Sequence, residues 1–218
     1  MINFNESMVS KYGFPDFHYK ERSKPSPGLI YGAGINDSPF ITEIKIEGIR
    51  YSHKAYLVWK SLLGRCFSAV EKEKHPTYVN TTCCKEWLLF TNFARWFKDN
   101  YISGYHLDKD LLVEGNEVYG PDTCIFIPQD INSFLTLSNK NRGLLPIGVS
   151  AKSGKYVSQI GGNKQRKHLG YFITKEEAHR AWQKAKLEQA IAFNFPPLQR
   201  VINQLIYEID NNLETKTL

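Results

Sequence analysis

Residues 106–113 hold the side chains whose types and spacing are best suited to chemistry. If this segment is a strand, its side chains alternate between two faces, so His106, Asp108 and Asp110 share one face. Carboxylates and an imidazole can move protons or bind cations, and spacing alone leaves their chemistry open. Two plainer interpretations also remain, because a lone histidine is usually structural and Asp110 could be a solvated acid at the end of a strand.

A basic segment in the C-terminal half is the second candidate. Residues 141–190 hold ten lysines and arginines against three glutamates, whereas the net charge of the whole chain is +6. The positive surplus is therefore confined to this segment. A concentrated positive field suits a polyanion such as a nucleic acid, and a solvated basic surface is the equally weighted alternative.

The four cysteines favour buried thiols over a metal site. Cys83 and Cys84 are adjacent, which is not the Cys-x-x-Cys spacing of zinc sites. We therefore do not expect zinc. The first residues lack the basic and apolar regions of a secretion signal, and no stretch approaches 18 apolar residues. These features predict a reducing, cytoplasmic location without a membrane partner.

The first half of the chain predicts an irregular arm followed by helices. Prolines and glycines break any long period in residues 1–50. The elements expected there and next are a strand pair at 42–46 and 50–51, a helix at 52–68 capped by Ser52, and a helix at 85–99. The aromatic stripe of the second helix could stack on bases, but its helical spacing favours a core position.

A strand–turn–strand–helix (ββα) unit is expected next, and then a small sheet. The ββα unit has strands at 106–113 and 124–127 and a helix at 129–137 that Pro128 opens. After a polar linker come strands at 147–150, 155–160 and 167–172, a helix at 175–193 and a helix at 198–209. Thr174 and Glu177 predict a capping box at the start of the helix at 175–193. The last eight residues are polar and are expected to fray.

A family resemblance is carried by four blocks of the C-terminal half. The blocks are Ile147-Gly-Val-Ser, Gly154-Lys-Tyr-Val-Ser-Gln-Ile160, Arg166-Lys-His-Leu-Gly-Tyr-Phe172 and Thr174-Lys-Glu-Glu-Ala178. Over about 45 residues they resemble the Apetala-two/ethylene-response-factor DNA-binding domain. That family lays a three-stranded sheet, backed by one helix, in the DNA major groove, so double-stranded DNA is the implied partner.

The middle of the chain carries a second resemblance. Its blocks are Arg65-Cys66, Cys84-Lys-Glu-Trp87, Leu107-Asp-Lys-Asp110, Tyr119-Gly-Pro-Asp-Thr-Cys124 and Ile131-Asn132. They are similar to bacteriophage-encoded HNH-type homing endonucleases, which often carry an Apetala-two-like module at the C-terminus. A phage origin would place the protein in the host cell cytoplasm.

Together the two resemblances imply an α+β fold. A small ββα-metal nuclease unit with flanking helices precedes a three-stranded antiparallel sheet packed on one helix. The implied divisions are an arm at 1–50, an HNH-like domain at 51–138, a linker at 139–144, an Apetala-two-like domain at 145–195, and a C-terminal helix and tail at 196–218.

The nuclease resemblance also implies a Mg²⁺ (or Mn²⁺) site. Asp108 aligns with the metal-binding carboxylate of the family, and Asp110 would be a second carboxylate ligand. Asn132, on the helix that follows, matches the last position of the motif and is placed among both the catalytic and the metal-binding residues. The metal would stabilise the transition state of phosphodiester hydrolysis.

Two of the three signature positions of the motif are altered. Lys109 stands where the family has its general-base histidine, and Thr123 stands where a central asparagine is usual. A lysine is a poor base unless its pKa falls by several units through burial or nearby cations. His106 is the alternative base.

The DNA-binding role is placed on residues in or beside the three C-terminal strands. The candidates are Lys152, Lys155, Tyr156, Gln159, Lys164, Arg166, Lys167 and His168. Arg166 retains an arginine of the plant family, whereas Ser150 replaces a base-contacting arginine and both Tyr156 and His168 replace tryptophans. A plant-like sequence preference is therefore not expected. About five phosphate contacts would give a log–log salt slope near −4 to −5.

The predicted function is that of a phage-type DNA endonuclease. It would hydrolyse phosphodiester bonds with a divalent metal and be targeted by the basic sheet, with no small-molecule cofactor. The alternative is a catalytically inactive DNA-binding protein, a regulator or site competitor, on a degenerate nuclease scaffold. A third hypothesis is single-strand binding through an aromatic side chain on the sheet, for which Tyr156 is the candidate.

Overall fold

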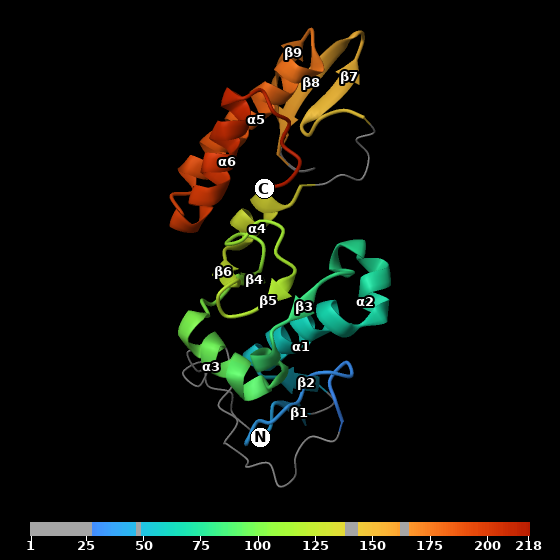
Figure 1. The fold of residues 1–218 in the computed structure, drawn as a ribbon, viewed down its shortest axis with the longest axis vertical. Coiled ribbons are helices and arrows are strands. Elements are labelled where there is room, and N and C mark those ends of the chain that lie inside the picture. Colours follow the sequence, from blue (N-terminus) through green and yellow to red (C-terminus); the bar gives the residue numbers. More distant parts are fainter. Residues whose placement is uncertain (1–27, 47–48, 138–143, 162–165) are drawn as a thin grey trace. The chain divides into compact units, whose positions relative to one another are not determined.

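The computed structural model describes residues 28–46, 49–137, 144–161 and 166–218 (Figure 1). The chain forms two compact units, Met1–Pro128 and Gln129–Leu218. Its fold class is α+β, as predicted, with short strands among helices in the first unit and a three-stranded antiparallel sheet in the second. Most of the predicted N-terminal arm and most of the predicted linker lie outside the described residues.

The first unit opens with the predicted strand pair. β1 (Glu43–Ile46) and β2 (Ile49–Ser52) are antiparallel, with Glu43 opposite Ser52. The Ser52 hydroxyl donates a hydrogen bond across this pair to Glu43 Oε1, at 2.9 Å. Ser52 therefore belongs to the strand and does not cap the next helix as we predicted. That helix, α1 (Lys54–Phe67), begins after His53 instead.

An aromatic core lies between α1 and α3 (Phe90–Asn100) of the first unit. Trp59, Phe90 and Phe93 are completely buried, and Trp59 Nε1 donates to the Trp87 carbonyl oxygen at 2.6 Å. The aromatic stripe is thus core, as its spacing indicated. Burial of such large rings stabilises the unit, by about 1.5–3 kcal/mol for each fully buried side chain.

The predicted helix at 85–99 is interrupted at Leu89. Its first turn is the 3₁₀ helix η3 (Lys85–Leu88), and Leu89 is extended before α3 begins. The cause is a strand-like bridge to Ile35, whose N–H donates to the Leu88 carbonyl at 2.7 Å and whose carbonyl accepts from the Phe90 N–H at 3.0 Å. A chain segment distant in sequence thus takes the hydrogen bonds that a continuous helix would use.

Short elements complete the first unit. α2 (Ala69–Lys74) and η2 (Pro76–Tyr78) lead to β3 (Thr82–Cys83), which pairs in parallel with β5 (Val118–Tyr119). β4 (His106–Asp108) pairs antiparallel with β6 (Ile125–Ile127). The predicted strand at 106–113 is therefore wrong beyond Asp108.

α4 (Gln129–Leu135) belongs to the second unit. Its Phe134 ring meets Phe193 edge-on at 5.2 Å, and the Phe134 carbonyl accepts from Lys186 Nζ at 2.5 Å. These contacts attach α4 to α5 (Lys175–Ala192). The division of the chain thus falls before α4, whereas we predicted a domain boundary after it, at residue 138.

The sheet of the second unit has the order β7-β8-β9 and packs on α5 (Figure 1). Its strands are β7 (Val149–Lys152), β8 (Lys155–Ile160) and β9 (Lys167–Phe172), close to the predicted ranges. Trp182 of α5 packs with Ile147 and Ile160. The capping box is confirmed: the Thr174 hydroxyl accepts from the Glu177 N–H at 3.1 Å, and the Thr174 N–H donates to Glu177 Oε2 at 3.2 Å.

The C-terminal tail is packed, contrary to our prediction of a frayed end. After η4 (Pro196–Leu198) and α6 (Gln199–Asp210), the chain returns over α5 and α6. Thr215 is completely buried, and its hydroxyl accepts from Gln183 Nε2 at 3.0 Å and donates to Glu208. Its N–H donates to His179 Nε2 at 3.0 Å. Buried polar groups on the two helices therefore hold a polar tail.

Candidate nucleic-acid interface

Asp108 lies at the end of β4 and turns the chain out of the strand. Its Oδ1 accepts hydrogen bonds from the backbone N–H groups of Asp110, at 3.0 Å, and Leu111, at 2.7 Å. Burial raises the pKa of Asp108, and these two N–H groups oppose that rise. This side-chain-to-backbone turn ends the alternation that we predicted, so Asp110 does not share a strand face with His106 and Asp108.

Lys109 closes the loop that follows Asp108. The residue is 9% exposed, and Nζ donates to Asp110 Oδ1 at 2.5 Å and to the Asn116 carbonyl at 2.6 Å. Asn116 Nδ2 donates in return to the Lys109 carbonyl at 2.8 Å. This arrangement gives Lys109 a structural role, and the predicted role of general base has no geometric support.

The acidic pair does not fit a divalent cation held jointly by Asp108 and Asp110. Asp110 already has an ammonium group 2.5 Å from Oδ1, which would repel a second cation. Asp108 directs Oδ1 at two backbone N–H groups. Within the described ranges, no group of three or more histidine, cysteine, aspartate or glutamate side chains is arranged to hold a metal ion.

The other two predicted catalytic residues lie on different elements: His106 is on the same strand as Asp108, and Asn132 is on a helix of the second unit. His106 is exposed at the start of β4, opposite Ile127 of β6. Asn132 is half-buried on α4 and belongs to the second unit. Since the positions of the two units relative to one another are not determined, Asn132 has no defined place beside Asp108.

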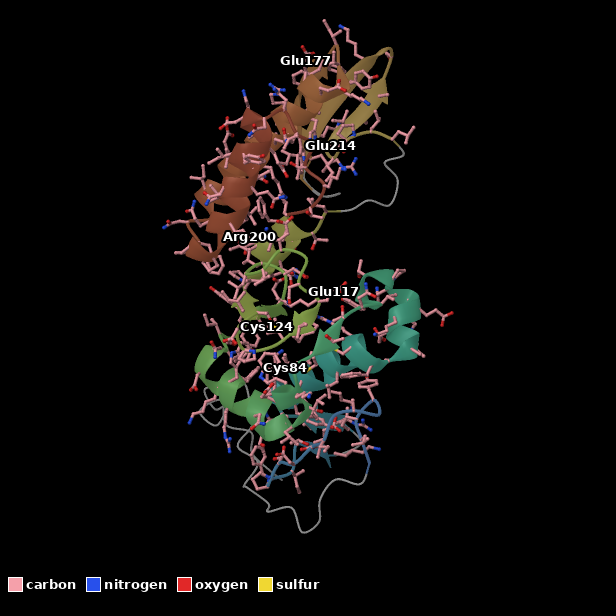
Figure 2. All side chains as sticks on the ribbon, viewed as in Figure 1. Cys84, Glu117, Cys124, Glu177, Arg200 and Glu214 are labelled. Carbon is pink, nitrogen blue, oxygen red and sulfur yellow. The ribbon has the colours of Figure 1, made fainter. Side chains whose placement is uncertain are left out.

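The four cysteines are free thiols of the first unit, and two of them, Cys84 and Cys124, are labelled in Figure 2. Cys66 and Cys124 are buried, as predicted, and Cys83 and Cys84 are half-buried. Burial raises the pKa of Cys66 to about 12 and that of Cys124 to about 12. Thiols with such values stay protonated near neutral pH and are poor nucleophiles and poor metal ligands.

The sheet of the second unit has two unlike faces. Along β8, Ile160 packs with Trp182 of α5, so Ser158 and Ile160 point to the helix side. Lys155, Val157 and Gln159 alternate with them and point to the other side. We call this second side the open face. Its members on the neighbouring strands follow from the pairing register, because paired residues share a face.

The register assigns polar and basic side chains to the open face. Ser150 of β7 and Tyr171 of β9 pair with Val157, Lys152 pairs with Lys155, and His168 pairs with Gln159. The open face therefore carries the following residues: Ser150, Lys152, Lys155, Val157, Gln159, His168 and Tyr171.

Two predicted DNA-binding residues do not lie on the open face by register. Tyr156 alternates with Lys155 and Val157, so it points to the helix side and is half-buried. Lys167 pairs with Ile160, although it is exposed at the start of β9. Arg166 is exposed just before that strand. Lys164 lies outside the described residues.

Cations lie at both ends of the sheet, and neutral polar groups lie between them. Lys152 and Lys155 flank the tight turn from β7 to β8. At the other end of β8, Lys167 begins β9 and Arg166 comes just before it. Five residue steps along β8 separate these ends by about 17 Å. The sequence has no acidic residue from 144 to 175. Such a surface can contact phosphates at its ends and hydrogen-bond in its middle.

Sequence reasoning missed Tyr171. The residue is 57% exposed, and the centroid of its ring lies 4.8 Å from that of His168. Residues three apart on a regular strand point to opposite faces, so alternation gave no signal for this pair. A register shift between β8 and β9 brings the two side chains together.

Searches against known protein families, curated proteins and solved structures found no match to the chain. Among the helices of the described residues, none is both long enough and apolar enough to cross a membrane.

Proposed function

We propose that the protein binds double-stranded DNA through the open face of the β7-β8-β9 sheet. The observation that carries the proposal is the distribution of charge: cations at both ends of the sheet, neutral hydrogen-bonding groups between them, and no carboxylate from residue 144 to 175. In duplex DNA, phosphates line both edges of the major groove and the base edges lie between them. The cations of the sheet would therefore meet the phosphates at the two edges of the groove, and the hydrogen-bonding groups between them would meet the base edges.

The dimensions of the sheet agree with this proposal. The major groove is about 12 Å wide and admits a two-stranded ribbon. The cationic ends lie about 17 Å apart along β8, and flexible lysine side chains can reach phosphates on both edges of the groove. Packing on α5 holds the three strands in fixed positions, so binding would not require the strands to become ordered.

A carboxylate placed on the open face, between the two cationic ends of the sheet, tests the proposal. Gln159→Glu preserves the shape of the side chain and adds a negative charge between the phosphates. We expect binding of the full-length protein to a random-sequence duplex pool, measured by fluorescence anisotropy, to weaken at least about tenfold. Gln189→Glu is the matched control, because Gln189 is exposed on α5. Absence of duplex binding by the wild type, or equal losses in both variants, would refute the proposal.

A metal-dependent DNA endonuclease is the second candidate function. Its supporting observation is the order of elements: β4 and β6 pair antiparallel, α4 follows β6 along the chain, and the partly buried Asp108 carboxylate ends β4. The ion pair of Lys109 with Asp110 argues against the metal site that the family resemblance implies.

Cleavage assays with Mg²⁺ or Mn²⁺ separate the two functions. Asp108→Asn retains an Oδ1 acceptor for the two backbone N–H groups, so the fold should persist. A nuclease centred on Asp108 would lose cleavage in this variant and keep DNA binding. If the wild type binds DNA and never cuts it in either metal, the protein is a DNA-binding protein without catalysis.

A further inference from the structure

A β-bulge in β9 builds an aromatic pair on the open face. The pairing steps from Ser158 opposite Gly170 to Gln159 opposite His168, which leaves Leu169 as an extra residue. Side chains three positions apart on a regular strand point to opposite faces, but one extra residue between them makes them point to the same face. His168 and Tyr171 consequently meet on the open face, with ring centroids 4.8 Å apart and an interplanar angle of 59°.

Gly170 makes the bulge possible. Its φ is +145°, a backbone conformation that other residues rarely adopt. A Cβ at this position would also lie 3.2 Å from the Phe172 ring on the helix side. The bulge is therefore specified by this glycine, and the aromatic pair depends on it.

The pair occupies the part of the open face that would lie over base edges. His168 is in register with the Gln159 amide, and Tyr171 is in register with Val157 and Ser150. The lysines and Arg166 lie toward the two ends of the sheet. Val157 points to the open face and is only 3% exposed, so neighbouring side chains cover it, and Tyr171 is the exposed side chain in this part of the face.

We propose that Tyr171, held against His168 by the bulge, is a specificity-determining residue that selects thymine in duplex DNA. The inference rests on the proposed function. The thymine 5-methyl group is the apolar feature that a base edge presents in the major groove, and aromatic side chains contact it there. The tilted rings of His168 and Tyr171 touch each other, so they form an edge rather than a flat platform on which an unstacked base could lie.

Enrichment of bound sequences from a random duplex pool, followed by removal of single methyl groups, tests this inference. The wild type should enrich duplexes with thymine at one or more fixed positions. Deoxyuridine lacks only the 5-methyl group, and its substitution there should weaken binding about fourfold, as expected for loss of one buried methyl group. Tyr171→Ala should lose the thymine preference and bind thymine and deoxyuridine duplexes equally, and its overall affinity should remain sensitive to salt.

Tyr207→Ala is the matched control, because Tyr207 is 61% exposed on α6 of the same unit. It should retain the thymine preference of the wild type. An unchanged preference in Tyr171→Ala, with duplex binding intact, would overturn this inference and leave the proposed function standing. Stronger binding to single strands than to duplexes would overturn it in favour of base stacking, and absence of any DNA binding would overturn both proposals.

Discussion

Removal of the cations at one end of the sheet should halve the salt dependence of DNA binding. The described cations at the two ends are Lys152, Lys155, Arg166 and Lys167. Each phosphate contact contributes about −0.9 to the slope of log affinity against log salt, so four contacts give about −3.6. Raising the salt concentration from about 50 to about 200 mM should then weaken wild-type binding about 150-fold.

The double variant Lys152→Gln/Lys155→Gln retains two of these contacts. Its slope should be about −1.8, and the same rise in salt should weaken its binding only about 12-fold. The double variant Arg166→Gln/Lys167→Gln should have the same slope, because each end of the sheet carries two of the four cations. Fluorescence anisotropy titrations of a labelled duplex at several KCl concentrations measure both slopes.

Lys184→Gln is the control for these variants, since Lys184 is an exposed cation on α5, the helix that covers the other face of the sheet. Its slope should equal that of the wild type. If the control reduces the slope as much as either double variant does, net charge governs binding and the open face has no special role. Unchanged slopes in both double variants would refute the reasoning outright.

Three further predictions concern the second unit, each measured by urea unfolding. Burial lowers the pKa of Lys186 to about 8, so above that pH the unfolded chain binds more protons than the folded one. The free energy of unfolding should therefore rise between about pH 8 and 10, by at most about 3 kcal/mol, and Lys186→Met should abolish the rise. Gly148→Ala should cost more than about 3 kcal/mol, because φ is +78° and a Cβ would lie 2.1 Å from Trp182. Thr215→Val should cost about 2 kcal/mol, because Glu208 and Gln183 lose a buried partner. A flat pH profile, or unfolding free energies equal to that of the wild type, would contradict these assignments.

Sequence reasoning succeeded where the signals are local. The three C-terminal strands and the helix that follows them were predicted to within a few residues, because side-chain alternation and turn residues act over short stretches. The capping box of Thr174 and Glu177 is a bond between residues three apart, and it was found for the same reason. The aromatic stripe of α3 was correctly assigned to the core.

The same reasoning failed where a distant segment takes over backbone hydrogen bonds. The predicted helix at 85–99 is interrupted because Ile35 pairs with the backbone beside Leu89. The tail was expected to fray because it is polar, yet Thr215 finds buried partners on α5 and α6. Ile35 is distant in sequence from Leu89, and the helices that bind Thr215 are separate elements. A local sequence pattern therefore could not predict either contact.

The sequence by itself determined the location of the positive charge, the identity of the strands that carry it and the helix that backs them. Only the tertiary structure decided which side chains share a face. Asp108 binds the backbone of its own turn, which removes Asp110 from the strand. The bulge at Leu169 places Tyr171 beside His168 on the open face, and strand alternation directs Tyr156 to the helix side. The physical reason is that pairing with neighbouring strands decides which face each side chain points to. A single extra residue in a strand reverses that direction for every side chain after it.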